Sequence, residues 1–426
     1  MDILLKQVEI VDRQSPWHGK KANVALRDGQ IVSVGNEEPA VEKAIDAEGL
    51  MLSVGWADMQ ANFADPGHEH KEGLTSGALA AAKGGFTDVA LVPNTNPAVQ
   101  SKNEISYIHS RNGQLVTQLH AIGAVTLDTK GEELTEMIDM YEAGAVAFSD
   151  GENPLWHTDI CLKALLYLQK FDGLLINKPY DKLLTAFGTM HEGVNSTIMG
   201  MKGMPSLAEE LAISRDLDIL AYAGGKLHFS NLSAAGSVEL VRKAKAKGLD
   251  VTCDVAAHQL MFHDGSFPDF DTNYKVNPPF RTQADVDALV EGLKDGTIDV
   301  IVSGHSPQDE ESKKLEFDAA EFGIIGLQTV LPILVQLGNK LDLATAIEKI
   351  TVAPRRRLGL EVPKIEEGEM ANLTLFDPKE KWILDDRTNK SKSKNSPFYG
   401  KELVGKPLAV FNKGRYMIDE RLLTTV

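Results

Sequence analysis

Residues 52–67 read LSVGWADMQANFADPG, and the pattern of the chain changes at this stretch. Beyond it, apolar runs of strand length alternate with amphipathic segments of helical length. Eight predicted strands, each followed by a predicted helix, are typical of a (β/α)8 barrel. The predicted strands are residues 52–59, 86–92, 118–125, 144–149, 173–178, 225–230, 249–255 and 298–303. The predicted helices are residues 73–83, 103–112, 131–142, 158–171, 205–220, 233–247, 283–296 and 324–337.

The two ends of the chain predict a second, smaller unit. Residues 24–35 predict a hairpin turning at Asp28-Gly29, and short alternating segments return at 372–376 and 407–414. We therefore expect an α/β fold in which a TIM-type barrel carries a small β-sandwich domain formed by both termini. The expected boundaries are 1–51 and 365–426 for the β-domain and 52–364 for the barrel.

Composition and charge exclude several classes of partner. The 426-residue chain has a net charge of −17, which argues against nucleic acid or an anionic membrane surface as a partner. No apolar run approaches the roughly 20 residues of a membrane span, and the N-terminus lacks a basic-then-apolar signal pattern. The two cysteines, Cys161 and Cys253, are too few for a disulfide framework. These features predict a cytoplasmic protein.

The chemistry of a barrel of this type lies at the carboxyl ends of its strands. A dinuclear hydrolytic centre there needs roughly four to six converging nitrogen and oxygen ligands, and neutral amides are poor ligands for a catalytic transition metal. The predicted strand ends do not supply such a set. They carry Gln60 and Asn62, Asn94, Asp150 with Glu152, Asn177 with Lys178, Asn231, Asp254 with His258, and Gly304 with His305.

Several motifs spread over most of the chain resemble one known family. They include Asp65-Pro66-Gly67-His68-Glu69-His70-Lys71-Glu72, Gly84-Gly85-Phe86-Thr87, Pro93-Asn94-Thr95-Asn96-Pro97, Phe148-Ser149-Asp150, Ser237-Val238-Glu239-Leu240, Lys275-Val276-Asn277-Pro278-Pro279-Phe280-Arg281 and Ser391-Lys392-Ser393-Lys394-Asn395-Ser396-Pro397-Phe398. The chain resembles dihydroorotases of the long bacterial and multifunctional-complex type, within the amidohydrolase superfamily. Allantoinases and hydantoinases share that fold, but the motifs around Asn277 and Ser391–Phe398 favour dihydroorotase.

The resemblance also indicates which residues occupy the family's functional positions. Gln60 and Asn62 fall at the two histidines that bind zinc after the first strand, and Ala64 falls at the arginine for the substrate carboxylate. The later metal positions carry Asp150 (or Gly151), Lys178 (or Asn177) and Asn231, while Gly304 replaces the general-base aspartate. Gln308 stands where the family has a further histidine. Asn94, Asn277 and His305 are retained from the substrate pocket. The resemblance therefore implies a vestigial pocket with no confident catalytic residue and no bound metal or other cofactor.

These replacements share a physical logic. Removing a divalent cation from a cluster of acids and imidazoles would leave uncompensated buried charge, which is costly. The amides and Gly304 neutralise the pocket, and Lys178 would supply a positive charge where the metal stood. We therefore expect Lys178 to form a salt bridge with Asp150 inside the barrel.

The remaining polar residues each have a structural alternative. Asn94 could hold its loop through an Asx-type turn instead of binding a ligand, and Asn277 is similarly ambiguous. His228, inside a predicted strand, is expected to be a hydrogen-bonded core histidine. His68 and His70 form a His-x-His pair too late for the end of the first strand, so we expect loop residues there rather than a replacement metal site.

Two functions remain open at this stage. In the first, the chain is a non-catalytic dihydroorotase homologue that acts as a structural or regulatory partner of aspartate carbamoyltransferase, as inactive dihydroorotase-like chains do in related systems. In the second, it is an active dihydroorotase with an atypical metal site, which hydrolyses the cyclic amide of dihydroorotate. The sequence favours the first, together with self-association as a two-fold dimer.

Overall fold

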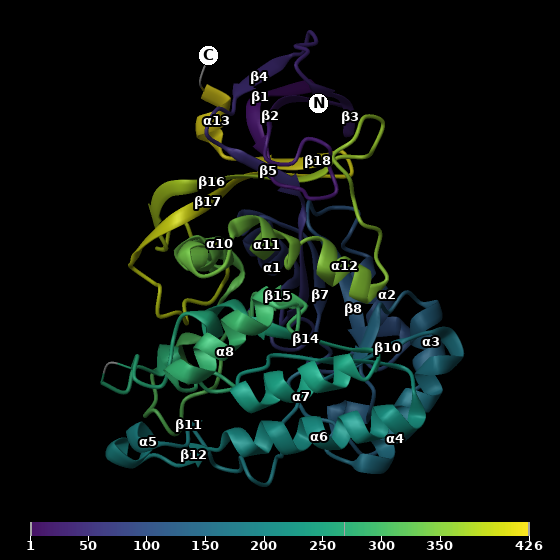
Figure 1. Cartoon of the computed structure of the whole chain (residues 1–426), viewed down its shortest axis with the longest axis vertical. Coiled ribbons are helices and arrows are strands. Elements are labelled where there is room, and N and C mark those ends of the chain that lie inside the picture. The colour runs from purple at the N-terminus through teal and green to yellow at the C-terminus, as the bar shows by residue number, and fades with distance from the viewer. Residues whose placement is uncertain (1, 268, 425–426) are drawn as a thin grey trace.

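The computed structural model describes residues 2–267 and 269–424. Figure 1 shows a large α/β body with a small β-domain at one end, where both termini lie. The predicted fold class, a TIM-type barrel with a β-domain from both termini, is confirmed. No helix in the described residues is long and apolar enough to cross a membrane.

Eight parallel strands form the barrel, in the spatial order β15-β14-β13-β10-β9-β8-β7-β6. All eight overlap predicted strands. Their bounds are β6 Trp56–Ala61, β7 Phe86–Leu91, β8 Gln118–Gly123, β9 Ala147–Ser149, β10 Leu174–Asn177, β13 Lys226–Phe229, β14 Val251–Ala256 and β15 Val300–Val302.

The first and last barrel strands meet through polar contacts. The amide of Asn62 donates to the carbonyl of His305 over 2.9 Å, and the amide and hydroxyl of Ser303 donate to the buried carboxylate of Asp58. Burial is the main cause that raises the pKa of Asp58 to about 7. Gln60 and Gly304 therefore come to lie at the same rim although they are far apart in sequence.

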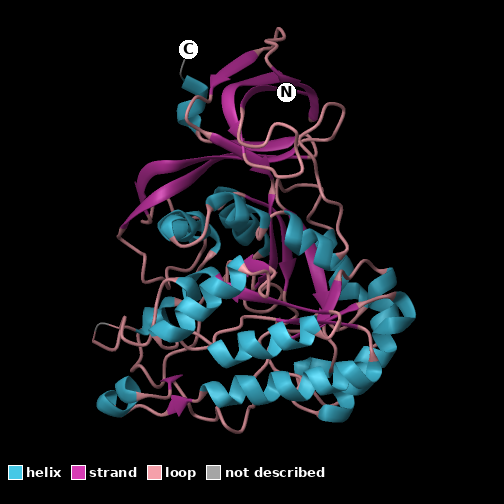
Figure 2. Cartoon of the chain, viewed as in Figure 1, coloured by secondary structure: helices cyan, strands magenta, loops and turns pink. Residues whose placement is uncertain are grey.

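Helices surround the barrel strands (Figure 2). The described α-helices are α1 Leu74–Lys83, α2 Lys102–His109, α3 Met137–Glu142, α4 Thr158–Leu168, α5 Val194–Met199, α6 Ser206–Ala223, α7 Ala235–Ala246, α8 Gln283–Lys294, α9 Glu310–Lys313, α10 Val330–Gln336, α11 Leu343–Glu348, α12 Val352–Leu358 and α13 Glu420–Thr424. The helix predicted over 131–142 begins only at Met137, because residues 126–135 form a loop in which the Thr126 hydroxyl accepts from the amide of Gly131. An additional excursion between β10 and α6 contains α5 and the short paired strands β11 Met190–His191 and β12 Gly203–Met204.

The β-domain is one eight-stranded mixed sheet built from both ends of the chain. Its strands are β1 Asp2–Ile10, β2 Lys21–Arg27, β3 Gln30–Gly35, β4 Lys43–Asp46, β5 Met51–Val54, β16 Asn372–Ile383, β17 Glu402–Asn412 and β18 Arg415–Ile418. The predicted Asp28-Gly29 hairpin joins β2 to β3, and both turn residues have positive φ, as a tight two-residue turn requires. The strand predicted over 52–59 is in fact two strands that separate at Gly55, since β5 pairs with β16 while β6 enters the barrel.

A buried ion pair of the barrel lies beside Gly55, where the barrel meets the β-domain. Arg355 of α12 contacts Asp88 of β7 over 2.6 Å and also donates to the Gly55 carbonyl over 2.6 Å. Asp88 further accepts from His120 and from Asn372 of β16. Burial opposes ionisation of Asp88, but the charge of Arg355 and these hydrogen bonds hold the pKa of Asp88 well below its usual range. This cluster is therefore one buried polar link between the two units, beside others such as the hydrogen bond from Asn412 of β17 to the carbonyl of Thr87.

Replacing Arg355 with methionine should lower the free energy of unfolding by about 3–5 kcal/mol, because the buried Asp88 carboxylate loses its counter-charge. Denaturant unfolding followed by circular dichroism measures the change. The matched control is Arg356→Met, whose exposed side chain donates to Gln14 over 3.3 Å and should change stability by no more than about 0.5 kcal/mol. Equal effects of the two variants would contradict the role of this ion pair.

Candidate functional site

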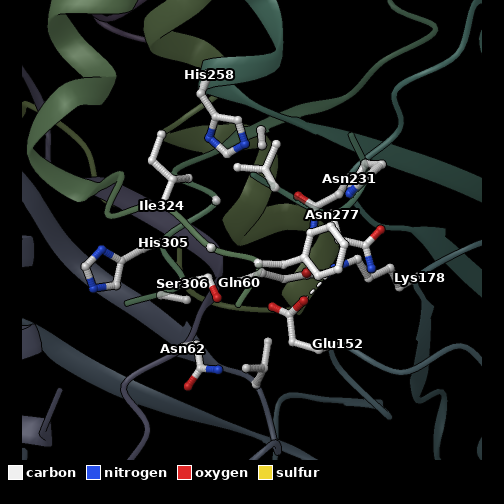
Figure 3. Close-up of a pocket in the computed structure, with 18 residues that line it drawn as sticks. Gln60, Asn62, Glu152, Lys178, Asn231, His258, Asn277, His305, Ser306 and Ile324 are labelled. Carbon is white, nitrogen blue, oxygen red and sulfur yellow. Dashed lines mark hydrogen bonds and ion pairs between the residues drawn. The ribbon is translucent and has the colours of Figure 1, made fainter. Parts of the chain in front are cut away.

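A cavity opens at the carboxyl end of the barrel and contains most of the predicted site residues (Figure 3). The segment Phe322–Ile324 and the loop around Asn277 cover part of it. The polar residues that line the cavity are Gln60, Asn62, Glu152, Lys178, Asn231, His258, Asn277, His305 and Ser306. Among the predicted site residues, Asn94 and Asp150 do not line it.

Lys178 projects into the cavity from the end of β10, and its side chain is only 3% exposed. Its ammonium lies 2.5 Å from a carboxylate oxygen of Glu152, in the loop after β9. Asn177 points elsewhere, since its side chain bonds to the amide of Leu155 and to Asp216. The residue of this pair that reaches the cavity is therefore Lys178.

Asp150 is not the partner of Lys178, so that prediction is wrong. The carboxylate of Asp150 instead accepts from the amides of Val125 and Thr126, over 3.0 and 2.9 Å, and from the Thr126 hydroxyl. Burial raises the pKa of Asp150 to about 6, against the effect of these hydrogen bonds. Because the carboxylate of Asp150 is hydrogen-bonded to Val125 and Thr126, the acid that lines the cavity is Glu152.

Asn94 and Gly151 hold the loop that presents Glu152. The Asn94 amide donates to the Asp150 carbonyl over 3.0 Å, and its oxygen accepts from the Glu152 amide over 2.7 Å. Gly151 has φ +61°, and a Cβ there would lie 1.9 Å from the Asn94 oxygen. Both polar atoms of the Asn94 side chain are thus hydrogen-bonded to backbone groups. Of the two roles considered for Asn94, the structure shows that of stabilising its loop.

His305 borders the cavity, but its ring is directed away from Lys178 (Figure 3). Its Nδ1 accepts from the Gly326 amide over 3.2 Å, and its Nε2 lies 3.6 Å from the buried carboxylate of Glu72. Burial opposes ionisation of Glu72, but His305, Ser391 and Ser76 together lower its pKa. Through Ser391, this cluster attaches the segment Ser391–Phe398 to the barrel rim.

His258 follows β14 and projects towards the middle of the cavity (Figure 3). Burial, and then the nearby charge of Lys178, lower the pKa of His258 to about 3, so the imidazole is neutral at physiological pH. Gly304 leaves the room that this ring needs, because a Cβ at Gly304 would lie 2.5 Å from His258 Cε1. A carboxylate at position 304 would therefore require His258 to move.

The amides complete the rim. Asn62 accepts from the amide of Ala64 over 2.8 Å through its side-chain oxygen, so that atom is committed to the local turn. The side-chain oxygen of Asn231 is buried, with no hydrogen-bond partner in the described part of the chain. Gln60 and Asn277 face the same cavity. The arrangement offers hydrogen bonds to a small polar molecule and one lysine–carboxylate pair.

His228, His68 and His70 lie outside the cavity lining. His228 is fully buried, with Nδ1 2.7 Å from the Thr252 hydroxyl and Nε2 2.9 Å from Asp254. The prediction of a hydrogen-bonded core histidine is confirmed. His68 and His70 lie in a loop, where His70 is 3.8 Å from Asp309. Residues 2–267 and 269–424 contain no cluster of three histidine, cysteine or acidic side chains that could hold a metal ion.

Comparisons with known proteins agree with this architecture. A family model described as dihydro-orotase-like matches residues 49–237. The chain is 40% identical over 430 residues to a dihydroorotase of Pelotomaculum thermopropionicum, covering 99% of this chain and 100% of the relative. A dihydroorotase of Acetivibrio thermocellus is 38% identical over 427 residues, with 99% and 100% covered. The chain belongs to the dihydroorotase family.

Solved structures of other proteins share the fold. The L-hydantoinase (dihydropyrimidinase) of Arthrobacter aurescens superposes with a TM-score of 0.86 at 22% identity, covering 98% of this chain and 96% of that one. The dihydropyrimidinase of Brevibacillus agri gives 0.82 at 20% identity, with 98% and 95% covered. At these identities the likeness concerns the fold alone.

The zinc used by dihydroorotases does not fit the residues present at this rim. Zinc is bound by imidazole, thiolate or carboxylate groups, whereas the positions that the resemblance assigns to metal ligands carry Gln60, Asn62, Lys178 and Asn231, all of which line the cavity. The ammonium of Lys178 would repel a cation, and Glu152 is already paired with it. His258 offers one neutral nitrogen, and a single imidazole does not make a zinc site.

Two residues that organise the rim were missed as site residues by the sequence reasoning. Glu152 was noted at a strand end without a role, although its place two residues after Asp150 in the same loop was a usable signal. Glu72 lies within a recognised motif, but only the tertiary structure brings it to His305 and Ser391. The contact of Glu72 does not follow from spacing along the chain.

We predict that Glu152→Gln destabilises the protein more than Lys178→Met. Removing the carboxylate leaves the ammonium of Lys178 buried without its partner, which should cost up to about 3–5 kcal/mol. Removing the ammonium leaves Glu152, whose side chain is 39% exposed and can be hydrated, so the cost should be about 1 kcal/mol. Denaturant unfolding of both variants at neutral pH tests this asymmetry, and the opposite order would show that Lys178 does not depend on Glu152.

Proposed function

We propose that this protein is a dihydroorotase-family member that does not turn over dihydroorotate and acts as a structural or regulatory partner of aspartate carbamoyltransferase. The observation that carries the proposal is the ion pair of the buried Lys178 with Glu152, at the rim where the resemblance to dihydroorotases places metal ligands. In this proposal the fold of a pyrimidine-biosynthesis family is kept while its hydrolytic chemistry is lost.

The chemistry of the lining residues supports the absence of turnover. Attack of water on a ring amide needs a group that activates the water and a group that stabilises the developing oxyanion. Gly304 has no side chain to act as a base, and the low pKa of His258, about 3, makes its imidazole a weak one. Ala64 also lacks the positive charge that would bind the substrate carboxylate. The remaining amides can bind a ligand, but they do not accept a proton.

A second candidate is an active dihydroorotase with an atypical metal site. The observation that favours it is the full-length identity of 40% and 38% to proteins that are themselves named dihydroorotase. On sequence similarity alone this candidate is the stronger one. It requires a metal arrangement different from the one that the family motifs describe.

Zinc analysis and a turnover assay distinguish the two candidates. We expect the purified protein to retain far less than one equivalent of zinc after chelator dialysis, and to consume dihydroorotate no faster than a buffer blank, with or without added zinc. The dihydroorotase of Pelotomaculum thermopropionicum, treated identically, is the positive control. Stoichiometric zinc together with turnover that is lost on chelation and restored by zinc would establish the second candidate.

The partnership is the other half of the proposal. The residues at the metal positions of the rim differ from those of the family, whereas the other family motifs are present from residue 52 to 398. This pattern favours a protein whose role is to bind other chains through its surface. We propose that it self-associates, most simply as a two-fold dimer, and binds aspartate carbamoyltransferase in the cytoplasm.

Mixing the protein with aspartate carbamoyltransferase from the same cell should produce a complex larger than either protein in size-exclusion chromatography with light scattering. The carbamoyltransferase of an unrelated organism serves as the control for specificity. If neither protein changes its elution in the presence of the other at micromolar concentrations, the scaffold role is refuted whatever the result of the turnover assay.

A further inference from the structure

One segment beside the cavity is held by side chains rather than by regular secondary structure. Residues 318–324, all within the described part of the chain, form neither helix nor strand, and we name them the cover segment. Its last three residues line the cavity, and Ile324 is labelled in Figure 3. The amide of Gly323 donates to the carbonyl of Lys275 over 2.9 Å, which joins the cover segment to the loop around Asn277. The contacts of this segment therefore determine whether the cavity is closed on that side.

Two buried lysines bind four backbone carbonyls of the cover segment. Lys275 precedes the loop around Asn277, Lys313 ends α9, and they are only 2% and 7% exposed. The acceptors are the carbonyls of Asp318 (2.9 Å) and Ala320 (2.6 Å) for Lys275, and those of Glu321 (2.8 Å) and Gly323 (3.3 Å) for Lys313. Among the residues that the structure describes, no carboxylate forms a salt bridge with either ammonium. The closed cover thus surrounds two positive charges with neutral acceptors.

The surroundings of Lys313 disfavour its positive charge. A buried ammonium with neutral acceptors loses hydration without gaining a counter-charge, and the ammonium of Lys275 repels it. Asp271 and Glu321 attract the charge, but burial and Lys275 prevail and lower the pKa of Lys313 to about 7. Burial likewise lowers the pKa of Lys275, against the attraction of Asp318 and Glu321. The closed cover therefore binds a proton at Lys313 less readily than an exposed lysine does, whose ordinary pKa is about 10.4.

We infer that Lys313 makes the cover segment a proton-sensitive gate over the cavity, which is closed at mildly alkaline pH and opens more readily as the pH falls. The cover segment supplies both carbonyls around the ammonium of Lys313, so its displacement would expose that ammonium to water. The open form then binds a proton more readily than the closed form, and opening becomes easier as the pH falls from about 10 to about 7. Below that range both forms are protonated, and the dependence ends. The inference concerns access to the cavity and is independent of the partner and of the absence of turnover proposed above.

Hydrogen exchange of the full-length protein at several pH values tests the inference. The protection factor of the amides of residues 318–324 corrects for the intrinsic pH dependence of exchange. We expect it to rise at least tenfold between roughly pH 6.5 and 8.5. In Lys313→Met it should not change with pH, because the titrating group is absent. The matched control is Lys314→Met, which removes an exposed ammonium paired with Glu310 and should keep the wild-type pH dependence.

The variant Lys313→Arg separates a titrating charge from a merely structural contact. Arginine stays protonated over this range, so the cover segment should be less protected in Lys313→Arg than in Lys313→Met at every pH. A side chain that acted only as a hydrogen-bond donor would give the opposite order, since arginine would replace it and methionine would not. Thermal unfolding checks that each variant is folded. Wild-type protection that is constant with pH, or a pH dependence that persists in Lys313→Met, would overturn the inference.

Discussion

The buried contact between Arg355 and Asp88 lies at the place where the chain passes from the terminal sheet into the barrel, and it constrains the structure there. Its guanidinium also donates to the carbonyl of Gly55, where the chain leaves the terminal sheet and enters the barrel. Gly55 cannot carry a side chain, because a Cβ would lie 2.1 Å from the Asn372 oxygen and 2.2 Å from the Thr87 hydroxyl. Arg355 therefore helps to position the start of β6, the strand that leads to Gln60 and Asn62 at the rim.

At the opposite end of the barrel the charges are few and paired. Lys178 and Glu152 form an ion pair, and Glu72 accepts from the hydroxyls of Ser76 and Ser391, while the other lining groups include neutral amides and the neutral imidazole of His258. A cavity of this kind is stable without a cation, since no cluster of like charges remains to be compensated. The Lys178–Glu152 pair also disfavours metal binding in the cavity, because a bound metal ion would have to displace the ammonium of Lys178.

The sequence by itself determined the eight barrel strands, the Asp28-Gly29 hairpin and the β-domain from both ends, because hydrophobic periodicity and turn residues act over a few neighbouring positions. It also identified the rim positions Gln60, Asn62, Lys178, Asn231 and Gly304 through the family motifs. Only the tertiary structure decided which acid faces Lys178: Asp150 is taken by the amides of Val125 and Thr126, and Glu152 is left for the cavity. The division at Gly55 and the meeting of His305 with Glu72 were likewise decided by packing. Such contacts join residues distant in sequence, and side-chain direction at a loop depends on hydrogen bonds that no local pattern encodes.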